Sequence, residues 1–187
     1  PMSVRHALLG LLAAGPKYGY QLRAQFERAT GATWPLNVGQ VYSTLGRLER
    51  DGLVVGAGSD GEGHVHYEAT AAGRDELEQW LRAPVDRSTP PRDELTIKVA
   101  VALTLPAVDS LEVIARQRAA TITVLQDYTK LKRAGEPRAT PTEDELAWSL
   151  VLESLIFNAE AEVRWLDHCE ARLRRLSGAG GTAASGI

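Results

Sequence analysis

Apolar residues recur at helical spacing in three successive segments of the first half of the chain, each followed by glycine or proline. The pattern predicts helices at about residues 3–14, 18–30 and 35–51. In the third segment, Val38, Val41, Leu45 and Leu48 fall within a stripe about 80° wide when successive residues are placed 100° apart. One face of this helix is therefore expected in a hydrophobic core and the opposite face in solvent.

Two shorter apolar-rich stretches follow, at 53–57 and 64–70, separated by the glycine-rich segment 58–63. The second stretch alternates apolar and polar residues, so the pair predicts a β-hairpin with a flexible loop. Thr70 is a suitable N-cap for a fourth helix that ends before Pro84. Three helices, a hairpin and one more helix predict a winged helix-turn-helix domain over residues 2–83.

The segment 84–91 contains three prolines, and the composition changes after it. We place a linker at 84–92 and a helical domain at 93–177, with helices at about 93–103 and 109–134. Thr142 and Glu145 have the spacing of a capping box, and helical pattern continues from there to Leu176. The small-residue tail 178–187 is expected to be disordered.

The last predicted helix is about 50 Å long at 1.5 Å per residue, and its segment 150–157 is apolar almost all round. Only two other helices of this domain are available to cover it. A second copy of the chain, packed by two-fold symmetry, is the economical solution. The fold class is therefore mainly α with a small β-hairpin wing, and the C-terminal helical domain is expected to dimerise. The predicted dimer interface consists of Trp148, Leu152, Leu155, Ile156, Ala159 and Val163.

Composition limits the other classes of function. The charged fraction of 24% and hydrophobic fraction of 44% are typical of a globular protein, and a net charge of -3 gives no global affinity for polyanions. No apolar run approaches the roughly 20 residues that span a bilayer, and the single cysteine excludes a disulfide framework, so a cytoplasmic protein is expected. No motif for a phosphate loop or activated nucleophile is present, which argues against an enzyme or a bound cofactor.

Charge is unevenly distributed along the chain. Residues 1–58 carry six basic and three acidic side chains, a net charge of +3, whereas the rest of the chain carries -6. A basic N-terminal region followed by an acidic remainder of the chain suits contact between the N-terminal region and DNA phosphates. The expected phosphate contacts on or before the second helix are Lys17, Tyr18 and Arg23.

The polar face of the third helix is the candidate DNA-reading surface. It carries Gly39, Gln40, Ser43, Arg47 and Arg50. Gln40 can pair with adenine, Arg47 with guanine or a phosphate, and Ser43 with either a base or a phosphate. The alternative is an ordinary solvated face, and the local positive charge favours DNA.

Three motifs resemble the PadR family of transcriptional regulators. They are GPKYGYQL at 15–22, GQVYSTLGRLERDGLV at 39–54 and YEATAAGR at 67–74. The resemblance implies a homodimeric repressor that binds a palindromic operator in double-stranded DNA and is often released by a small molecule. It also implies that Tyr42 lies in the recognition helix and touches the DNA backbone. From its position at the edge of the apolar stripe, Tyr42 could equally anchor the helix in the core.

The wing departs from the family pattern, in which the tip is usually basic. Asp60 and Glu62 occupy this tip, so His64 and His66 are the cations that it could bring to DNA, and only when protonated. The same His-x-His pair is too small a ligand set for a metal, so no metal site is predicted.

Aromatic residues offer contacts for a small aromatic or hydrophobic effector, namely Trp80, Trp148 and Trp165. Trp148 and Trp165 lie about 26 Å apart along one helix, so one chain cannot bring both to a single pocket. The alternative is that these side chains pack in the core or the dimer contact. For the whole chain, the alternative to a DNA-binding regulator is a helical adaptor that uses a winged helix to bind protein.

Overall fold

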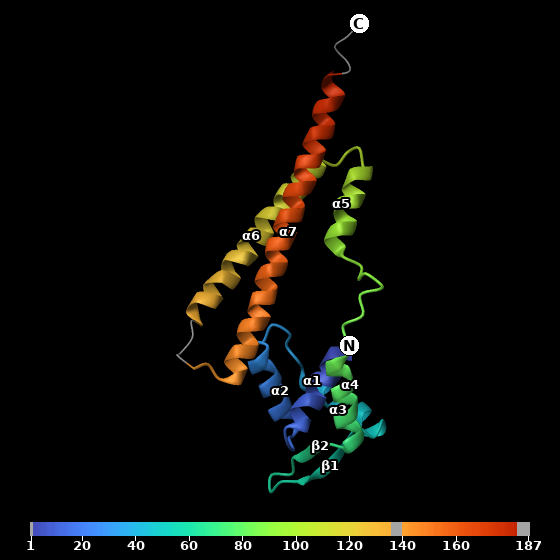
Figure 1. The fold of residues 1–187 in the computed structure, drawn as a ribbon, viewed down its shortest axis with the longest axis vertical. Helices are drawn as coiled ribbons and strands as arrows, with labels where there is room; N and C mark the ends of the chain where they lie inside the picture. Colours follow the sequence, from blue (N-terminus) through green and yellow to red (C-terminus); the bar gives the residue numbers. More distant parts are fainter. Residues whose placement is uncertain (1, 136–139, 183–187) are drawn as a thin grey trace. The chain divides into compact units, whose positions relative to one another are not determined.

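The computed structural model describes residues 2–135 and 140–182, which form two compact units. The first unit contains Pro1–Arg87 together with Pro141–Trp148, and the second contains Ser88–Thr140 together with Ser149–Ile187. Figure 1 shows the helices of both units and the small hairpin of the first unit. Among the described residues, none of the helices combines the length and the apolar character needed to cross a membrane.

The first unit has the element order predicted for a winged helix. Its elements are α1 (Met2–Ala13), α2 (Gly19–Ala29), α3 (Val38–Arg50), β1 (Val54–Ser59), β2 (Val65–Ala69) and α4 (Ala71–Arg82). The core gathers apolar side chains from the helices and the hairpin, including Leu8, Leu9, Leu12, Leu22, Val41, Leu45, Leu48 and Val54. The helical stripes read from the sequence thus converge on one core, and the expected mainly α winged-helix fold is confirmed.

The β-hairpin is antiparallel and is extended by a short third segment. Val54 pairs with Ala69, Gly56 with Tyr67 and Ser59 with Val65, with an irregularity between Gly56 and Ser59. Lys17 then joins Tyr67 through two backbone hydrogen bonds of 2.9 and 3.0 Å. The hairpin is therefore fastened to the segment that precedes α2.

The start of α3 differs by three residues from the predicted start at Pro35. Asn37 is the N-cap, and its Oδ1 accepts a hydrogen bond of 2.7 Å from the backbone N–H of Gln40. A side chain that satisfies the free N–H groups of the first turn fixes where a helix begins, and Asn is among the best residues for this. The prediction overlooked Asn37 because it took the nearby proline as the start signal.

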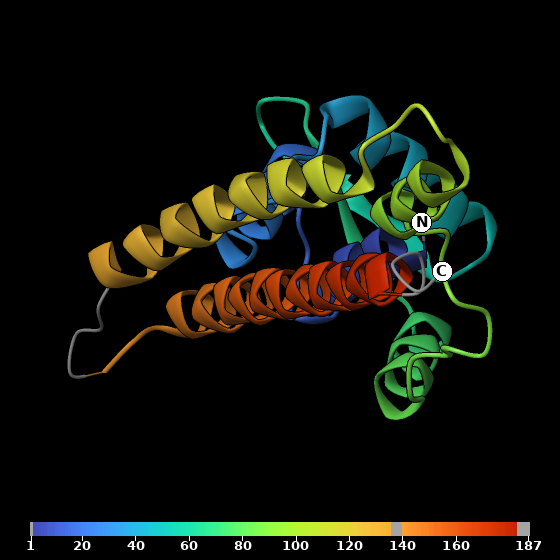
Figure 2. The same ribbon diagram turned by 90° about the horizontal axis from the view of Figure 1, so that it is seen from above.

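The second unit is built from α5 (Glu94–Thr104), α6 (Ser110–Ala134) and α7 from residue 149 onward, α7 as a whole being Glu143–Thr182. Figures 1 and 2 show α6 and α7 running alongside each other. Val99, Ile114 and Leu166 form the apolar centre of this unit. Arg118 of α6 pairs with Asp167 at 2.8 Å and Glu170 at 2.7 Å, so ionic contacts accompany the apolar ones.

One prediction about α7 is confirmed and two need correction. The predicted capping box at its start is present, since Thr142 and Glu145 exchange hydrogen bonds of 2.7 and 3.2 Å. However, residues 141–148, which the sequence assigned to the helical domain, belong to the first unit, where Asp144 lies 3.6 Å from Arg28. The helix also continues to Thr182, within the tail predicted to be disordered, because each interior glycine costs only about 1 kcal/mol and does not forbid a helix. Residues 183–187 of that predicted tail lie outside the described residues.

Two helical glycines should respond in opposite directions to substitution by alanine. A Cβ at Gly73 in α4 would clash with the backbone carbonyl of Leu53, whereas a Cβ at Gly46 in α3 meets no atom within 4 Å. Gly73→Ala should destabilise the fold by about 1–3 kcal/mol through overpacking. Gly46→Ala should stabilise it by about 0.5–1 kcal/mol because alanine loses less backbone entropy. Denaturant unfolding of both variants checks this, and equal shifts of the same sign would contradict the packing of α4 on Leu53.

Candidate nucleic-acid interface

The outer face of α3 is an open polar surface on a helix whose inner face is buried. Val41 and Leu48 are completely buried and Leu45 almost so. The exposed residues of α3 are Gly39, Gln40, Tyr42, Ser43, Gly46, Arg47, Glu49 and Arg50, so this outer face carries one acidic and two basic side chains. Gly39 and Gly46 leave two gaps in it, since a Cβ at Gly46 meets nothing and a Cβ at Gly39 meets only the Asn37 side chain, at 3.3 Å. The backbone of α3 can therefore approach a partner closely at two points one heptad apart.

Gln40 is held at the start of this surface by a reciprocal pair of hydrogen bonds. Its Oε1 accepts from the backbone N–H of Asn37 at 3.1 Å, while Asn37 accepts from the Gln40 backbone. This arrangement is a capping box. The predicted two-point pairing of Gln40 with adenine needs the same oxygen and amide group, so Gln40 would have to leave the box to form it.

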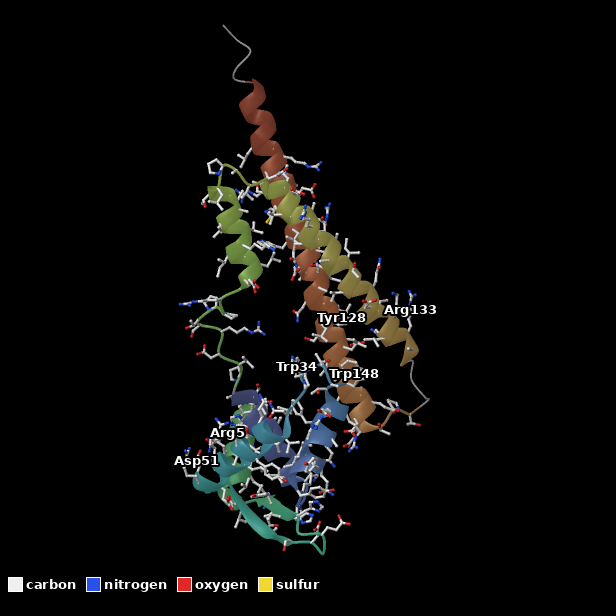
Figure 3. The ribbon with its side chains drawn as sticks, turned by 180° about the vertical axis from the view of Figure 1, so that it is seen from behind. Arg5, Trp34, Asp51, Tyr128, Arg133 and Trp148 are labelled. Atoms are coloured by element: carbon white, nitrogen blue, oxygen red, sulfur yellow. The ribbon has the colours of Figure 1, made fainter. Side chains whose placement is uncertain are left out.

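The two arginines of the outer face have different partners. Arg50 donates through Nε and Nη2 to Asp51 at 3.0 and 2.9 Å, and Asp51 also accepts from Arg5 at 2.9 Å. Figure 3 shows Arg5 and Asp51 side by side. The hydrogen bond from Arg50 is the main cause that lowers the pKa of the Asp51 carboxyl. Arg47, in contrast, donates through Nε to the backbone carbonyl of Ser43 at 3.2 Å.

The basic residues near α2 also have protein partners. Lys17 donates from Nζ to the carbonyls of Leu11 at 2.9 Å and Gly15 at 3.2 Å. It therefore satisfies carbonyls at the end of α1, where the negative end of the helix dipole favours a cation. Arg23 donates to Glu27 at 2.9 Å, one turn further along α2. Phosphate contact by either side chain remains a prediction and would compete with these bonds.

Tyr42 is partly packed and partly exposed. Its ring packs against Gly19 at the start of α2, where a Cβ would come within 2.7 Å of the ring, yet 40% of the residue is exposed. The contact ties α3 to α2, and any side chain at position 19 would displace the Tyr42 ring. Contact of Tyr42 with DNA remains a prediction.

An aromatic cluster joins the wing to the start of α2. The Tyr18 ring stacks on His64 with centroids 4.6 Å apart and meets His66 edge-on at 5.4 Å. Asp60 closes the tip, because its carboxylate accepts from the backbone N–H groups of Glu62 and His64 and lies 3.1 Å from Nδ1 of His64. The segment predicted as a flexible loop is thus a short turn held by Asp60, and β1 extends to Ser59.

The predicted interface on α7 is only partly available at the surface of the chain. Leu152 and Ala159 are covered by the chain itself and offer little surface to a second copy, so their part in a dimer contact stays a prediction. Helical spacing places the two residues on one face of α7, and the way α7 packs covers that face. Leu155, Ile156 and Val163 are half-buried. The exposed apolar residues of α7 in the second unit instead include Leu150, 58% exposed, and Phe157, 65% exposed.

The exposed apolar face of α5 was not predicted as a contact surface. Ile97 is 50% exposed and Val101 49%, on the side opposite the buried Val99 and Ala102. A signal was present in the sequence, since this short helix is apolar on both faces, and such a helix is normally covered on both.

The three tryptophans considered as effector contacts have separate surroundings. Trp80 stacks on the buried His6 with centroids 4.8 Å apart. Trp148, labelled in Figure 3, lies against Gly31 at the end of α2, where any Cβ would clash with the indole. Trp165 packs in the apolar cluster of the second unit. Within the described ranges, no group of three or more metal-ligating side chains occurs.

Comparison with known proteins places two family models on the chain. The Transcriptional regulator PadR-like family matches residues 8–79, and the Virulence activator alpha C-term family matches residues 91–174. The negative transcriptional regulator PadR of Bacillus subtilis is 27% identical over 174 residues, which cover 88% of this chain and 93% of that protein.

Solved structures of the same Bacillus subtilis protein share the fold. Its complex with operator DNA has a TM-score of 0.69 at 23% identity and covers 92% of this chain and 99% of that chain. Its complex with p-coumaric acid has a TM-score of 0.70 at 23% identity, with coverage of 91% and 98%.

The Asp60 turn yields a pH prediction. The hydrogen bond from the backbone of His64 is the main cause that lowers the pKa of the Asp60 carboxyl below its ordinary value of 3.8. A carboxyl with a lowered pKa stabilises the folded turn above its ordinary pKa, and this contribution is lost as the pH falls through the lowered value. The amide NMR signal of His64 should therefore titrate with a midpoint below 3.8. Asp60→Asn should abolish the titration, and a midpoint above 3.8 in the unsubstituted protein would contradict the turn.

Proposed function

We propose that this chain, whose residues 8–79 match the PadR-like family of transcriptional regulators, binds operator DNA through α3 and represses transcription. Repression is supported by the similarity of this chain to a negative regulator, a similarity that extends over 93% of the length of that regulator. The observation that carries the DNA proposal is the division of α3 into a buried, mainly apolar face and an exposed face with two glycines and two arginines. A helix with such a face can enter the major groove and bring side chains to base edges.

The acting species is a homodimer on a palindromic operator. Support comes from the apolar side chains that the second unit leaves exposed on α5 and α7, including Ile97, Val101, Leu150 and Phe157. Exposed apolar groups on two helices of one unit are typical of a contact surface, and a second copy of the chain is the simplest partner. Two-fold symmetry would then present two copies of α3 to two half-sites.

Release of the repressor by a small aromatic or hydrophobic molecule is the third part of the proposal. The similar Bacillus subtilis protein was crystallised with p-coumaric acid, a small aromatic acid. Trp148 is the candidate contact that the structure favours among the three tryptophans, because it is half-buried against a glycine and does not belong to an apolar cluster. Trp80 and Trp165 are already stacked or packed.

A protein-binding adaptor is the alternative use of this fold, and salt dependence distinguishes it. If a dimer neutralises about 6–8 phosphates, DNA affinity should fall by roughly three to five orders of magnitude between 50 and 200 mM salt. Fluorescence anisotropy with the DNA that flanks the gene, and with scrambled DNA, measures this. Absence of DNA binding at 50 mM salt would favour the adaptor.

The dimer proposal is tested by placing charge on the exposed apolar face of α7. Leu150→Glu combined with Phe157→Glu should convert the dimer to a monomer, because an unpaired carboxylate in an apolar interface costs several kcal/mol. The fold of each chain should persist, since both side chains are more than half exposed. Sedimentation velocity gives the mass, with Asn158→Glu as a control that adds a charge beside Phe157. A double variant that still sediments as a dimer would place the interface elsewhere.

A further inference from the structure

We propose that Arg47 carries the base discrimination of α3 and that Gln40 is a positioning residue that fixes the start of this helix. The inference rests on the proposed DNA-binding function and specifies which side chain reads sequence. It departs from the expectation that Gln40 pairs with adenine.

Gln40 has its hydrogen-bonding capacity directed at its own helix. Its Oε1 lies 3.1 Å from the backbone nitrogen of Asn37, and the Asn37 side chain accepts from the Gln40 backbone at 2.7 Å. Both bonds satisfy N–H groups that have no partner within the helix. A glutamine that leaves this box to bind adenine would expose one of these groups, so reading through Gln40 would weaken the element that presents it.

Arg47 has the geometry that Gln40 lacks. Its Nε bond to the Ser43 carbonyl uses one of the five guanidinium N–H donors and fixes the side chain along the outer face. The donors on Nη1 and Nη2 form the planar fork that matches O6 and N7 of guanine. Among the residues that the structure describes, no carboxylate pairs with Arg47, whereas Arg50 is paired with Asp51 and Arg23 with Glu27.

The surroundings of Arg47 allow a base edge to come close. Ser43 and Arg50, one turn before and after Arg47, are its exposed neighbours on the outer face, and the adjacent Gly46 has open space around its missing Cβ. Small neighbours let the groove floor approach the helix, which a base contact through a side chain needs. The same arginine held by a carboxylate, as Arg50 is, would have to break an ion pair first.

The experiment compares base preference across matched variants of the full chain. Selection from random double-stranded DNA with the unsubstituted protein gives an operator, and competition with single base-pair variants gives a preference profile. Arg47→Lys keeps the charge but loses the fork, so it should lose preference for guanine at one position by about 5- to 140-fold, which corresponds to about 1–3 kcal/mol. Affinity for scrambled DNA should change less than about threefold. Arg50→Lys is the control and should keep the profile.

Gln40 is tested with the same profile and with thermal unfolding. Gln40→Ala should lower Tm by about as much as Asn37→Ala and should leave the base profile unchanged, whereas Gln40→Glu should restore Tm because glutamate also closes a capping box. Loss of adenine preference in Gln40→Ala, with the Arg47→Lys profile unchanged, overturns the inference while the DNA-binding function stands. If the unsubstituted protein selects no sequence at all, the proposed function fails and the inference fails with it.

Discussion

Burial of one face of α3 is the constraint on which the rest of the first unit depends. Val41, Leu45 and Leu48 lie in a core shared with α1, α2 and the hairpin, and burying such side chains contributes about 1.5–3 kcal/mol each. Once these three are inside, helical geometry leaves Ser43 and Arg47 outside. The exposed outer face of α3 therefore follows directly from the burial of its inner face.

Polar contacts at the two ends of α3 fix the limits of this helix, which the core alone does not. The capping box of Asn37 and Gln40 sets the first residue of the helix, and the Arg5–Asp51–Arg50 group fixes its last turn. Between these ends, the outer face holds two glycines and one arginine without a carboxylate partner in the described part of the chain. Residues 1–58 carry a net charge of +3, but fewer of their basic side chains are free to bind phosphates than this number indicates. Lys17, Arg23 and Arg50 already have protein partners.

The fold was predictable from the sequence because the spacing of apolar residues determines the helices and strands. Individual contacts were less predictable because they depend on how these elements pack together. The stripes of α3, the cap at Thr70 and the capping box at Thr142 are local signals and all are present. The inward direction of Leu152 and Ala159 depends on how α7 packs, which no local pattern gives. The capping role of Gln40 was readable, since Asn37 lies three residues before it, but a glutamine on a polar face suited DNA equally well.

The most direct test of this account is to locate DNA on the protein. Backbone amide NMR signals of the isotope-labelled chain, followed during titration with the selected operator, report which residues change surroundings. The account predicts the largest changes along α3 between Gly39 and Arg47, with smaller changes at the wing turn and little change in α6. Changes centred on the exposed face of α5, with α3 unaffected, would contradict it.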